Sequence, residues 1–375
     1  MSQPIIDPSK YSFLLQQKNV AIRDQFASFS PPEIEVFSSP DTAYRMRVEF
    51  RVWHEKDALN YVMFTPGSNH EHTNVTQCPM ASKIIQQHMF VLLELIKPVE
   101  ILRKKLFQID FLSTSSGELL ISLLYHKAIG EQWLQSAQQL QADLRAVSSD
   151  GQIVELIGRA RKTKIALGRD FVIETMNVDG APMYYQQVEN SFTQPNAKVC
   201  EHMLHWALDV TRDRGGDLVE LYCGNGNFSL PLARNFDNVI ATEISKSSVN
   251  SAQYNIKLNQ IENVKILRMS SEEFSQALQG VREFRRLKLN DVDLNSYQFS
   301  TVLVDPPRSG LDDETVKQVA QYDGIVYISC SPATLQLNLL SLCETHEIKR
   351  FAIFDQFPYT DHLEIGVFLE RKKVV

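Results

Sequence analysis

Two side chains with complementary chemistry stand near the carboxyl end of this chain, each beside a predicted β-strand. Cys330 follows the apolar run GIVYIS (324–329), and Glu364 precedes the run IGVFLER (365–371). A thiolate is a strong nucleophile that adds readily to a conjugated carbon, and a carboxylate can then remove a proton from the product. The pair therefore predicts covalent catalysis, with Cys330 as nucleophile and Glu364 as base.

Both residues also have a plain structural interpretation. A free cysteine is most often a small buried hydrophobe, and a carboxylate at a strand start is ordinarily exposed. We expect simple packing for the other four cysteines, which are Cys78, Cys200, Cys223 and Cys343. The five cysteines are scattered and include no C-x-x-C pair, so we expect no metal site and no iron–sulfur cluster. The polar neighbours of Cys330 and its place at a strand end favour chemistry there.

A loop with two glycines follows a third apolar strand. DLVELY (217–222) continues into CGNGNFS, where Gly224 and Gly226 allow a sharp bend and close approach of a ligand. A dinucleotide-binding loop would carry a third glycine at the position of Ser229, so a small cofactor without a phosphate fits better. Glu243 ends the next predicted strand, where a carboxylate can accept hydrogen bonds from ribose hydroxyls.

The second half of the chain alternates helices with strands that are apolar throughout, which is typical of a parallel sheet covered on both faces. Predicted strands cover 217–222, 238–244, 264–269, 301–305, 324–329 and 365–371, and predicted helices cover 197–212, 227–235 and 246–259. One strand ends in Asp305-Pro306-Pro307, a stiff exit with an acidic group at a ligand-binding edge. We expect residues 281–298 to form an exposed insertion.

The first half has a different pattern, typical of an α+β module. Strands are predicted at 44–54, 107–114 and 118–126, and helices at 9–27, 80–97 and 130–146. We place the domain boundary at residue 190, with domains of 1–190 and 191–375. Local basic clusters occur at 45–51, 103–105 and 159–164, each of which alone would be read as a solvated face.

The bulk composition limits the classes of protein. The formal net charge of −7 argues against a protein that coats nucleic acid without discrimination, since such binding depends on neutralising phosphates. No signal-like start and no apolar run of membrane-spanning length is visible. We therefore expect a soluble, cytoplasmic monomer.

Five segments occur in the order and spacing of one enzyme family. They are SFTQPNA (191–197), ELYCGNGNFSLPLA (220–233), VDPPRSGLD (304–312), ISCSPATL (328–335) and FPYTDHLE (357–364). Together they resemble the RNA uracil-5-methyltransferases. The first half, with YRMRVEFRVWH (44–54) and LIGRARKTKIALG (156–168), resembles the members that act on tRNA. Ribosomal-RNA members usually carry an amino-terminal β-barrel and a cysteine-rich iron–sulfur segment, which this chain lacks.

The resemblance implies a Rossmann-like class I methyltransferase domain, a doubly wound sheet with an antiparallel last strand, preceded by an α+β RNA-binding domain. It implies S-adenosylmethionine as cofactor, a Cys330 adduct at carbon 6 of uracil and removal of the carbon 5 proton by Glu364. The implied cofactor contacts are Gln194, Tyr222, Asn227, Glu243 and Asp305, and the implied RNA contacts are Glu49, Arg51, Phe107, Gln108 and His126. Ser331 departs from the asparagine common at that position.

The implied substrate is the T-loop uridine at the fifty-fourth nucleotide of tRNA, which becomes ribothymidine, with the tRNA-like part of tmRNA as a further substrate. Three other readings remain open. A ribosomal-RNA uridine methyltransferase is the nearest alternative. A nicotinamide oxidoreductase would share the glycine loop but leave Cys330 and Glu364 without a role. A non-catalytic RNA-binding protein would keep RNA affinity without Cys330.

Overall fold

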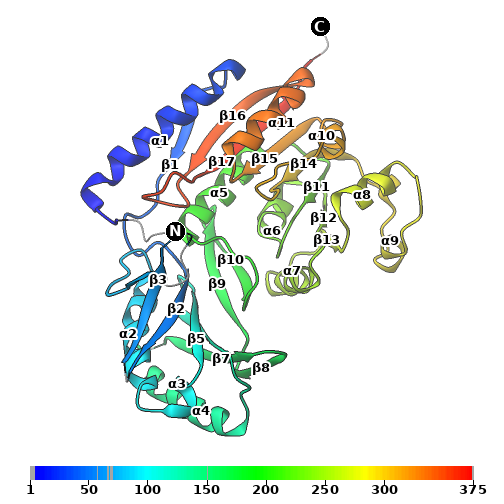
Figure 1. The fold of residues 1–375 in the computed structure, drawn as a ribbon. Helices are drawn as coiled ribbons and strands as arrows, with labels where there is room; N and C mark the ends of the chain where they lie inside the picture. The colour runs from blue at the N-terminus through cyan, green and yellow to red at the C-terminus, as the bar shows by residue number, and fades with distance from the viewer. Residues whose placement is uncertain (1–4, 57, 66, 68–70, 150, 374–375) are drawn as a thin grey trace. The chain divides into compact units, whose positions relative to one another are not determined.

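The chain folds into two compact units, each built from separate stretches of sequence. The computed structural model describes residues 5–56, 58–65, 67, 71–149 and 151–373. The first unit comprises Met1–Pro8, Pro40–Thr175 and Gln187–Ala197, and the second comprises Ser9–Ser39, Met176–Gln186 and Lys198–Val375. Figure 1 shows both, coloured along the chain. In the part of the chain that is described, no helix is both long and apolar enough to cross a membrane.

An eight-stranded sheet forms the centre of the second unit. Its strand order is β1-β16-β17-β15-β14-β11-β12-β13. The bounds are β1 (Ile34–Phe37), β11 (Asp217–Leu221), β12 (Asn238–Thr242), β13 (Val264–Leu267), β14 (Phe299–Val304), β15 (Gly324–Ser329), β16 (His346–Phe354) and β17 (Glu364–Arg371). Strands β11 to β15 pair in parallel, whereas β17 pairs antiparallel with both β15 and β16. The predicted doubly wound sheet with an antiparallel last strand is confirmed.

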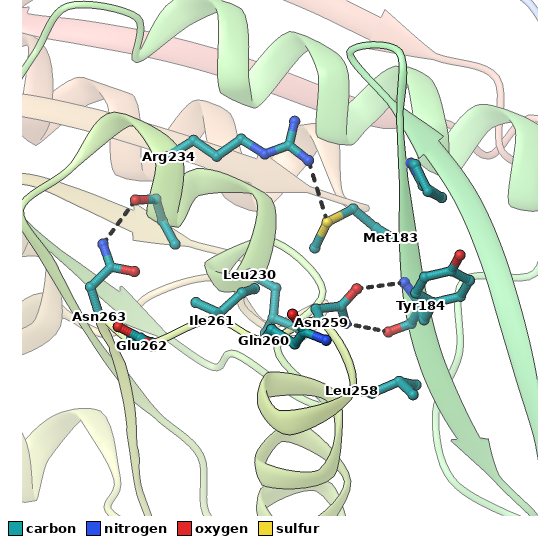
Figure 2. A pocket seen from close by; sticks show the side chains of 12 residues that line it. Met183, Tyr184, Leu230, Arg234, Leu258, Asn259, Gln260, Ile261, Glu262 and Asn263 are labelled. Carbon is teal, nitrogen blue, oxygen red and sulfur yellow. Dashed lines mark hydrogen bonds between the residues drawn. The ribbon is translucent and has the colours of Figure 1, made fainter.

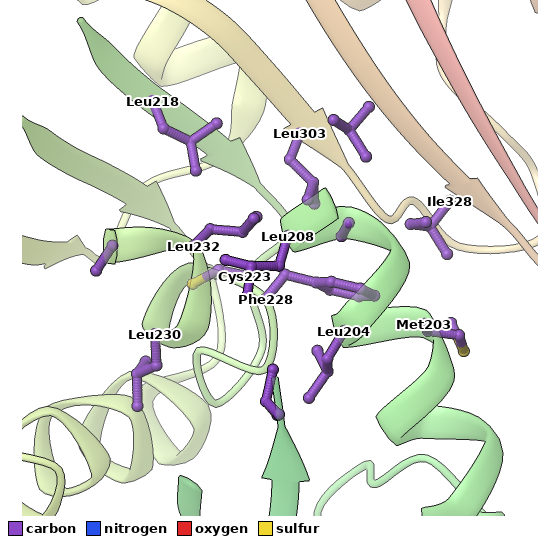
Figure 3. Close-up of a cluster of buried hydrophobic side chains, with 14 of the residues drawn as sticks. Met203, Leu204, Leu208, Leu218, Cys223, Phe228, Leu230, Leu232, Leu303 and Ile328 are labelled. Atoms are coloured by element: carbon purple, nitrogen blue, oxygen red, sulfur yellow. The ribbon is translucent and has the colours of Figure 1, made fainter. Parts of the chain in front are cut away.

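Helices cover both faces of this sheet, each over its own apolar cluster. One cluster includes side chains of α5 (Ala197–Val210), α6 (Ser229–Leu232) and α7 (Lys246–Leu258), with η3 (Ala233–Asn235) continuing α6. Figure 3 shows Leu204 and Leu208 of α5 beside Phe228 and Cys223. The other cluster includes side chains of α1 (Tyr11–Phe26), α8 (Ser271–Leu278), α10 (Asp313–Val319) and α11 (Pro332–Thr345). Burial on both faces explains why these strands are apolar throughout.

The amino-terminal segment differs from the sequence-based division at residue 190. That division assigned residues 9–39 to the first domain, but β1 pairs in parallel with β16, Ile34 opposite Phe351. Ile22 and Phe26 of α1 are buried in the core of the second unit. The short helices η1 (Pro8–Lys10) and η2 (Ala27–Phe29) flank α1. Strand pairing across more than 300 residues leaves no local pattern in the sequence.

The predicted insertion at 281–298 is largely exposed, but two side chains anchor it. It contains α9 (Arg285–Leu289) and η4 (Leu294–Ser296). Phe284 and Val292 are each 8% exposed and belong to the core of the second unit. The segment is therefore held on the fold by its apolar residues, which the charged sequence around them obscured.

A seven-stranded sheet forms the first unit, in the order β4-β3-β2-β5-β6-β7-β8. Its strands are β2 (Arg47–Glu55), β3 (Ala58–Phe64), β4 (His72–Asn74), β5 (Leu106–Ser113), β6 (Glu118–Tyr125), β7 (Ile153–Ala160) and β8 (Thr163–Leu167). Its helices are α2 (Lys83–Ile96), α3 (Glu100–Arg103) and α4 (Glu131–Ala146). Tyr61 of β3 donates to the Met89 carbonyl of α2 at 2.7 Å. The predicted α+β module is present. The expected elements β2, β5, β6, α2 and α4 lie close to their expected bounds, whereas β3, β4, β7 and β8 were not predicted.

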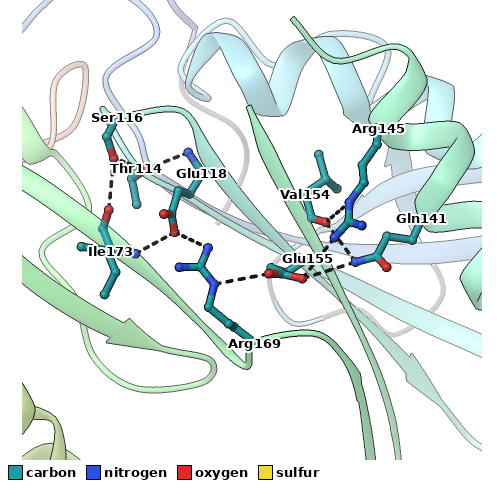
Figure 4. Close-up of polar contacts among 9 residues, drawn as sticks. All are labelled: Thr114, Ser116, Glu118, Gln141, Arg145, Val154, Glu155, Arg169 and Ile173. Carbon is teal, nitrogen blue, oxygen red and sulfur yellow. Dashed lines mark hydrogen bonds and ion pairs between the residues drawn. The ribbon is translucent and has the colours of Figure 1, made fainter. Parts of the chain in front are cut away.

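A polar network fastens the end of this sheet to the strand that follows it. Arg169 donates to Glu118 at 2.9 Å and to Glu155 at 3.3 Å, as Figure 4 shows. Glu118 also accepts from the backbone amide of Ile173 at 2.8 Å. Ile173 lies in β9 (Phe171–Val178), which pairs with β10 (Ala181–Val188). Arg169 thus joins β6 to β7 and offsets the cost of the nearly buried Glu155, while Glu118 links β6 to β9.

Candidate active site

The carboxyl edge of the parallel strands in the second unit carries most of the predicted site. From β11 the chain proceeds outward to β12 and β13, then crosses back to β14 on the other side of β11. Such a switch in strand order opens a ligand-binding crevice at the carboxyl ends. Glu243 follows β12, Asp305 follows β14 and Cys330 follows β15. These three side chains therefore start from the carboxyl ends of β12, β14 and β15, with β11 between β12 and β14.

Strand β17 brings Glu364 to the same edge because it runs antiparallel. Its register sets Ile365 opposite Ser329. Glu364 is the first residue of β17, and Cys330 is the residue after β15, so the two continue this pairing by one step. The Glu364 carboxylate is close enough to raise the pKa of the Cys330 thiol, after the larger effect of burial. The structure thus unites residues that lie 34 positions apart.

Glu364 lies in an environment that resists ionisation. The residue is 5% exposed, and burial raises its pKa well above the usual value of 4.5, with the Asp305 carboxylate adding to the shift. Burial also raises the pKa of Asp305, to about 7. A carboxyl group with a raised pKa is a stronger base once it ionises. Among structural carboxylates this degree of burial is uncommon, so the plain reading of an exposed strand-start residue does not apply.

Cys330 is surrounded by opposing influences. Burial, Glu364 and Asp305 raise the pKa of its thiol above 9.0, whereas the Arg308 guanidinium lowers it. Helix α11 begins two residues later at Pro332, and the positive end of a helix favours a nearby thiolate. The Ser331 amide donates to Ser329 Oγ at 3.2 Å, which fixes the backbone around the thiol. Ser331 itself makes no side-chain capping bond to the helix.

The glycine loop after β11 holds a strained backbone. Tyr222 has a φ of 65°, a conformation rare outside glycine and asparagine, and Gly226 has a φ of 83°. A Cβ at Gly226 would lie 2.3 Å from Leu230 Cδ1, and the positive φ of this residue also favours glycine. The Gly224 amide donates to Glu243 Oε2 at 3.0 Å. This hydrogen bond joins the glycine loop to the Glu243 carboxylate, as expected from their spacing in the sequence.

This structure suits a nucleoside without a phosphate at the loop. A Cβ built on Gly224 would meet nothing within 4 Å, so the loop faces open space. Glu243 accepts from the Gly224 and Ser245 amides, at 3.0 and 2.7 Å, and a carboxylate held in this way can still accept from ribose hydroxyls. The Asn227 carbonyl accepts from Tyr185 at 3.0 Å, which fixes that residue beside the loop. Gln194 belongs to the first unit, and its predicted cofactor contact stays a prediction.

The sequence analysis did not single out two ionisable residues of the candidate site, Glu220 and Arg308. Glu220, inside β11, is 1% exposed and accepts a hydrogen bond from Ser229 Oγ beneath the glycine loop. Burial raises its pKa to about 8. The acidic residue in an otherwise apolar strand was the available signal. Arg308, in the motif after Asp305, is the cation that lowers the pKa of both Cys330 and Glu364.

The predicted RNA-binding residues lie on two neighbouring strands and the turn after a third. Arg51 of β2 pairs with Gln108 of β5. The Phe107 ring stacks on the His126 ring, with centroids 3.8 Å apart and planes 11° apart, and the Arg51 guanidinium lies 5.5 Å from the Phe107 centroid. Arg51, His126 and Glu49 are exposed. Phe107 is therefore a half-buried surface ring and not a core residue.

A pocket of about 530 Å³ lies elsewhere in the second unit. Figure 2 shows it between β10 and the loop that precedes β13, with Arg234 donating to Met183 Sδ at 3.6 Å. None of the predicted site residues lines it. Among the described residues, no group of three or more His, Cys, Asp or Glu side chains is arranged to hold a metal ion.

Comparison with known proteins identifies the family. The model of the tRNA (uracil-5-)-methyltransferase family matches residues 10–372. The chain belongs to this family. A relative from Vibrio vulnificus, a tRNA/tmRNA (uracil-C(5))-methyltransferase, is 56% identical over 98% of each chain. A relative of the same name from Psychromonas ingrahamii is 56% identical over 99% of this chain and all of its own.

A solved structure supports the fold. The Pyrococcus abyssi tRNA (uracil-54, C5)-methyltransferase, in complex with S-adenosyl-L-homocysteine, matches with a TM-score of 0.70 and 20% identity, covering 96% of this chain and 83% of its own. The solved structure confirms the predicted fold class, and membership of the family confirms the predicted family, enzyme class and cofactor. The protein is an S-adenosylmethionine-dependent RNA methyltransferase. A nicotinamide oxidoreductase and a non-catalytic RNA-binding protein are both excluded by this membership.

Proposed function

We propose that this enzyme transfers a methyl group from S-adenosylmethionine to carbon 5 of uridine 54 in the T-loop of tRNA, giving ribothymidine. The observation that carries the proposal is that Cys330 and Glu364 stand at adjoining ends of β15 and β17, on the sheet edge that also carries the glycine loop. The names of the 56% identical relatives supply the substrate class. The chemistry of each residue follows from the difficulty of the reaction.

Carbon 5 of uracil is a weak nucleophile until electrons are pushed into the ring. In the proposed first step Cys330 Sγ bonds to carbon 6, and the electron pair of the double bond moves toward carbon 5 and O4 as an enolate. Arg308 favours the thiolate that this step consumes. Tyr222, Asn227, Glu243 and Asp305 would hold S-adenosylmethionine, which would supply the methyl group for carbon 5 and leave as S-adenosylhomocysteine.

Glu364 completes the cycle. Carbon 5 now carries both the methyl group and its original hydrogen, and the carboxylate of Glu364 takes that hydrogen as a proton. The electron pair of the broken C–H bond re-forms the double bond between carbons 5 and 6, and the C–S bond breaks to release the Cys330 thiolate. Burial of Glu364 suits this role, since a desolvated carboxylate binds a proton strongly.

The first unit would supply RNA binding. A base inside a folded T-loop cannot reach a thiol in a crevice, so the target uridine must leave its stack. The stacked pair of Phe107 and His126, with Arg51 beside it, offers aromatic and cationic groups for bases and phosphates. Glu49 and Gln108 extend the same surface in this proposal.

Three finer points belong to the same proposal. The enzyme also methylates the tRNA-like part of tmRNA, as the names of its relatives suggest. Gln194 joins the cofactor contacts. The protein acts as a monomer in the cytoplasm, without a metal ion, and light scattering of the purified protein with and without tRNA tests the oligomeric state.

Labelled methyl transfer tests the proposal directly. With tritiated S-adenosylmethionine, the enzyme should label unmodified tRNA at uridine 54, and nucleoside analysis should recover the label as ribothymidine. Ribosomal RNA should remain unlabelled under the same conditions. Preferential labelling of ribosomal RNA would instead establish the ribosomal alternative, and label in any other nucleoside would reject the proposed chemistry.

A further inference from the structure

A lysine of the amino-terminal helix is bonded to the loop that leads to Glu364. Lys18 Nζ, on α1, donates to Asp355 Oδ1 at 2.6 Å, to the Phe357 carbonyl at 3.0 Å and to the His362 carbonyl at 2.8 Å. An ammonium group has three hydrogens, so these bonds use all of them. The Lys18 and Asp355 side chains are only 10% and 2% exposed. The contact is therefore a buried, fully satisfied clamp.

The three acceptors lie in the loop 355–363, which joins β16 to β17. Its near end is fixed by Asp355 and its far end by His362, two residues before Glu364. Between them, Thr360 Oγ1 donates to the Phe357 carbonyl at 2.7 Å and accepts from the His362 amide at 3.2 Å. Lys18 thus draws together the two ends of a loop that has its own internal bonds.

The loop also contains a backbone conformation that needs support. Tyr359 has a φ of 62°, which costs free energy for a residue with a side chain. Its ring contacts Tyr11 of α1, with centroids 5.7 Å apart. Tyr11 in turn accepts a hydrogen bond from the Ser39 amide at 2.7 Å. One helix therefore holds the loop at a buried ion pair and at an aromatic contact.

We infer that Lys18 is a positioning residue for the catalytic base, which sets the place of Glu364 by tying the 355–363 loop to α1. The inference rests on the proposed role of Glu364. Strand pairing fixes Glu364 on one side only, where it lies opposite Phe354 of β16. The loop 355–363 before it lies outside the strands, and the Lys18 bond to the His362 carbonyl holds the backbone on that side. The Lys18 bonds also account for part of the contact by which Ser9–Ser39 belong to the second unit.

A merely structural ion pair would have different consequences. Its loss would lower the fraction of folded enzyme, and the folded molecules would complete every step at the normal rate. Loss of a positioning residue slows one step in folded enzyme. A displacement of about 1 Å in a catalytic group can cost roughly 10²-fold in rate. Since Glu364 acts after methyl transfer, the slowed step should be release of the Cys330 adduct.

The test compares three variants with the wild-type enzyme. Lys18→Met removes the ammonium and keeps an unbranched chain, and Gln17→Met places the same residue at an exposed position of the same helix. Glu364→Gln provides the reference for a lost base. If the unpaired Asp355 prevents folding, Lys18→Met/Asp355→Leu removes both charges, a change that buried pairs often tolerate. Circular dichroism and thermal unfolding establish which variants fold.

The readout is a methylated covalent enzyme–tRNA complex on ordinary uridine RNA, seen in denaturing gels with labelled methyl. Lys18→Met, or the double variant, should accumulate this complex as Glu364→Gln does, with kcat lowered roughly 10²-fold and KM for tRNA unchanged. Gln17→Met should behave as the wild type. A folded Lys18 variant that resolves the complex at the normal rate, while Glu364→Gln traps it, overturns the inference alone. If Glu364→Gln traps none, the role of the base fails and this inference falls with it.

Discussion

At the scale of residues, several buried carboxyl groups and the Arg308 guanidinium set the electrostatics of the site. Glu220, Asp305 and Glu364 all have raised pKa values because they are buried together at one sheet edge. The Asp305 and Glu364 carboxylates oppose ionisation of the Cys330 thiol, and the Arg308 guanidinium favours it. A substrate with a phosphate backbone adds further negative charge. Reactivity of the thiol should therefore depend on which of these groups carries its charge.

The identity of the nucleophile can be tested with a substrate that cannot complete the cycle. Fluorine at carbon 5 cannot leave as a proton, so RNA with 5-fluorouridine at the target position should form a methylated covalent complex that survives a denaturing gel. Cys330→Ala should form none. The nearby Cys223 is 3% exposed, and Cys223→Ala serves as the control that should still form the complex. A full yield of complex with Cys330→Ala would assign the nucleophile elsewhere.

The influence of Arg308 predicts a shift in pH dependence. Because its guanidinium lowers the pKa of the Cys330 thiol, Arg308→Gln should raise that pKa and move the pH profile of iodoacetamide modification toward alkaline values. Glu364→Gln should move it the other way, since Glu364 raises the pKa. Mass spectrometry of the Cys330 peptide follows the modification. If the wild-type, Arg308→Gln and Glu364→Gln proteins give the same pH profile, neither charge influences the pKa of the Cys330 thiol.

At the scale of elements, local patterns revealed the strands and not their distant partners. The apolar runs predicted β11, β12, β14 and β15, and strand-end chemistry then pointed to Asp305 and Cys330. Strand β1 and its partner β16 were missed because a local stretch of sequence contains no signal that Ile34 pairs with Phe351. The bond of Lys18 to Asp355, 337 residues apart, was missed for the same reason. The sequence therefore predicted the reactive residues at strand ends. It did not predict the long-range contacts that support them, which form only when distant segments meet in the folded chain.

Asn338 of α11 helps to fix the loop after Asp305. Asn338 Oδ1 accepts from the Leu311 amide at 3.0 Å and from Tyr327 OH at 2.8 Å, and its Nδ2 donates to the Leu311 carbonyl at 3.0 Å. Asn338→Leu should leave these groups unpaired, cost roughly 1–3 kcal/mol of stability and loosen Asp305. Urea unfolding and calorimetric titration with S-adenosylmethionine should both show weakening. Leu337→Ala, at a 65% exposed site on the same helix, should change neither quantity.

At the scale of the whole molecule, two sheets are assigned two different tasks. The eight-stranded sheet carries the glycine loop, the thiol and the base, and the seven-stranded sheet carries the stacked rings of Phe107 and His126. The overall charge of −7 does not favour general RNA binding. Recognition must therefore come from specific surfaces, which explains why composition alone gave no sign of RNA. If the tasks are separate, single substitutions should affect one binding event and spare the other.

Glu243→Ala and Phe107→Ala test this separation in opposite directions. Removing the Glu243 carboxylate takes away the acceptors for the ribose and the bond from the Gly224 amide, so affinity for S-adenosylmethionine should fall by about 10-fold or more. Its tRNA affinity should stay near the wild-type value. Removing the Phe107 ring should weaken tRNA binding by roughly 1–3 kcal/mol, the range for a base stacked on an aromatic side chain, and spare the cofactor. Arg51→Ala should act in the same direction as Phe107→Ala, with a stronger dependence on salt because a cation near phosphates is screened.

Calorimetry with the cofactor and filter binding with unmodified tRNA, performed on the same preparations, provide the comparison. Phe192, 76% exposed in the first unit and outside the predicted RNA contacts, supplies the matched control as Phe192→Ala. If the Phe107→Ala protein has normal tRNA affinity and normal turnover, the Phe107 ring contributes to packing and not to RNA binding. A Glu243→Ala protein that loses tRNA and cofactor together would show that the two sheets bind their ligands as one coupled site. The separation expected here requires each variant to fail in only one titration, because the contacts that each side chain makes lie within one unit.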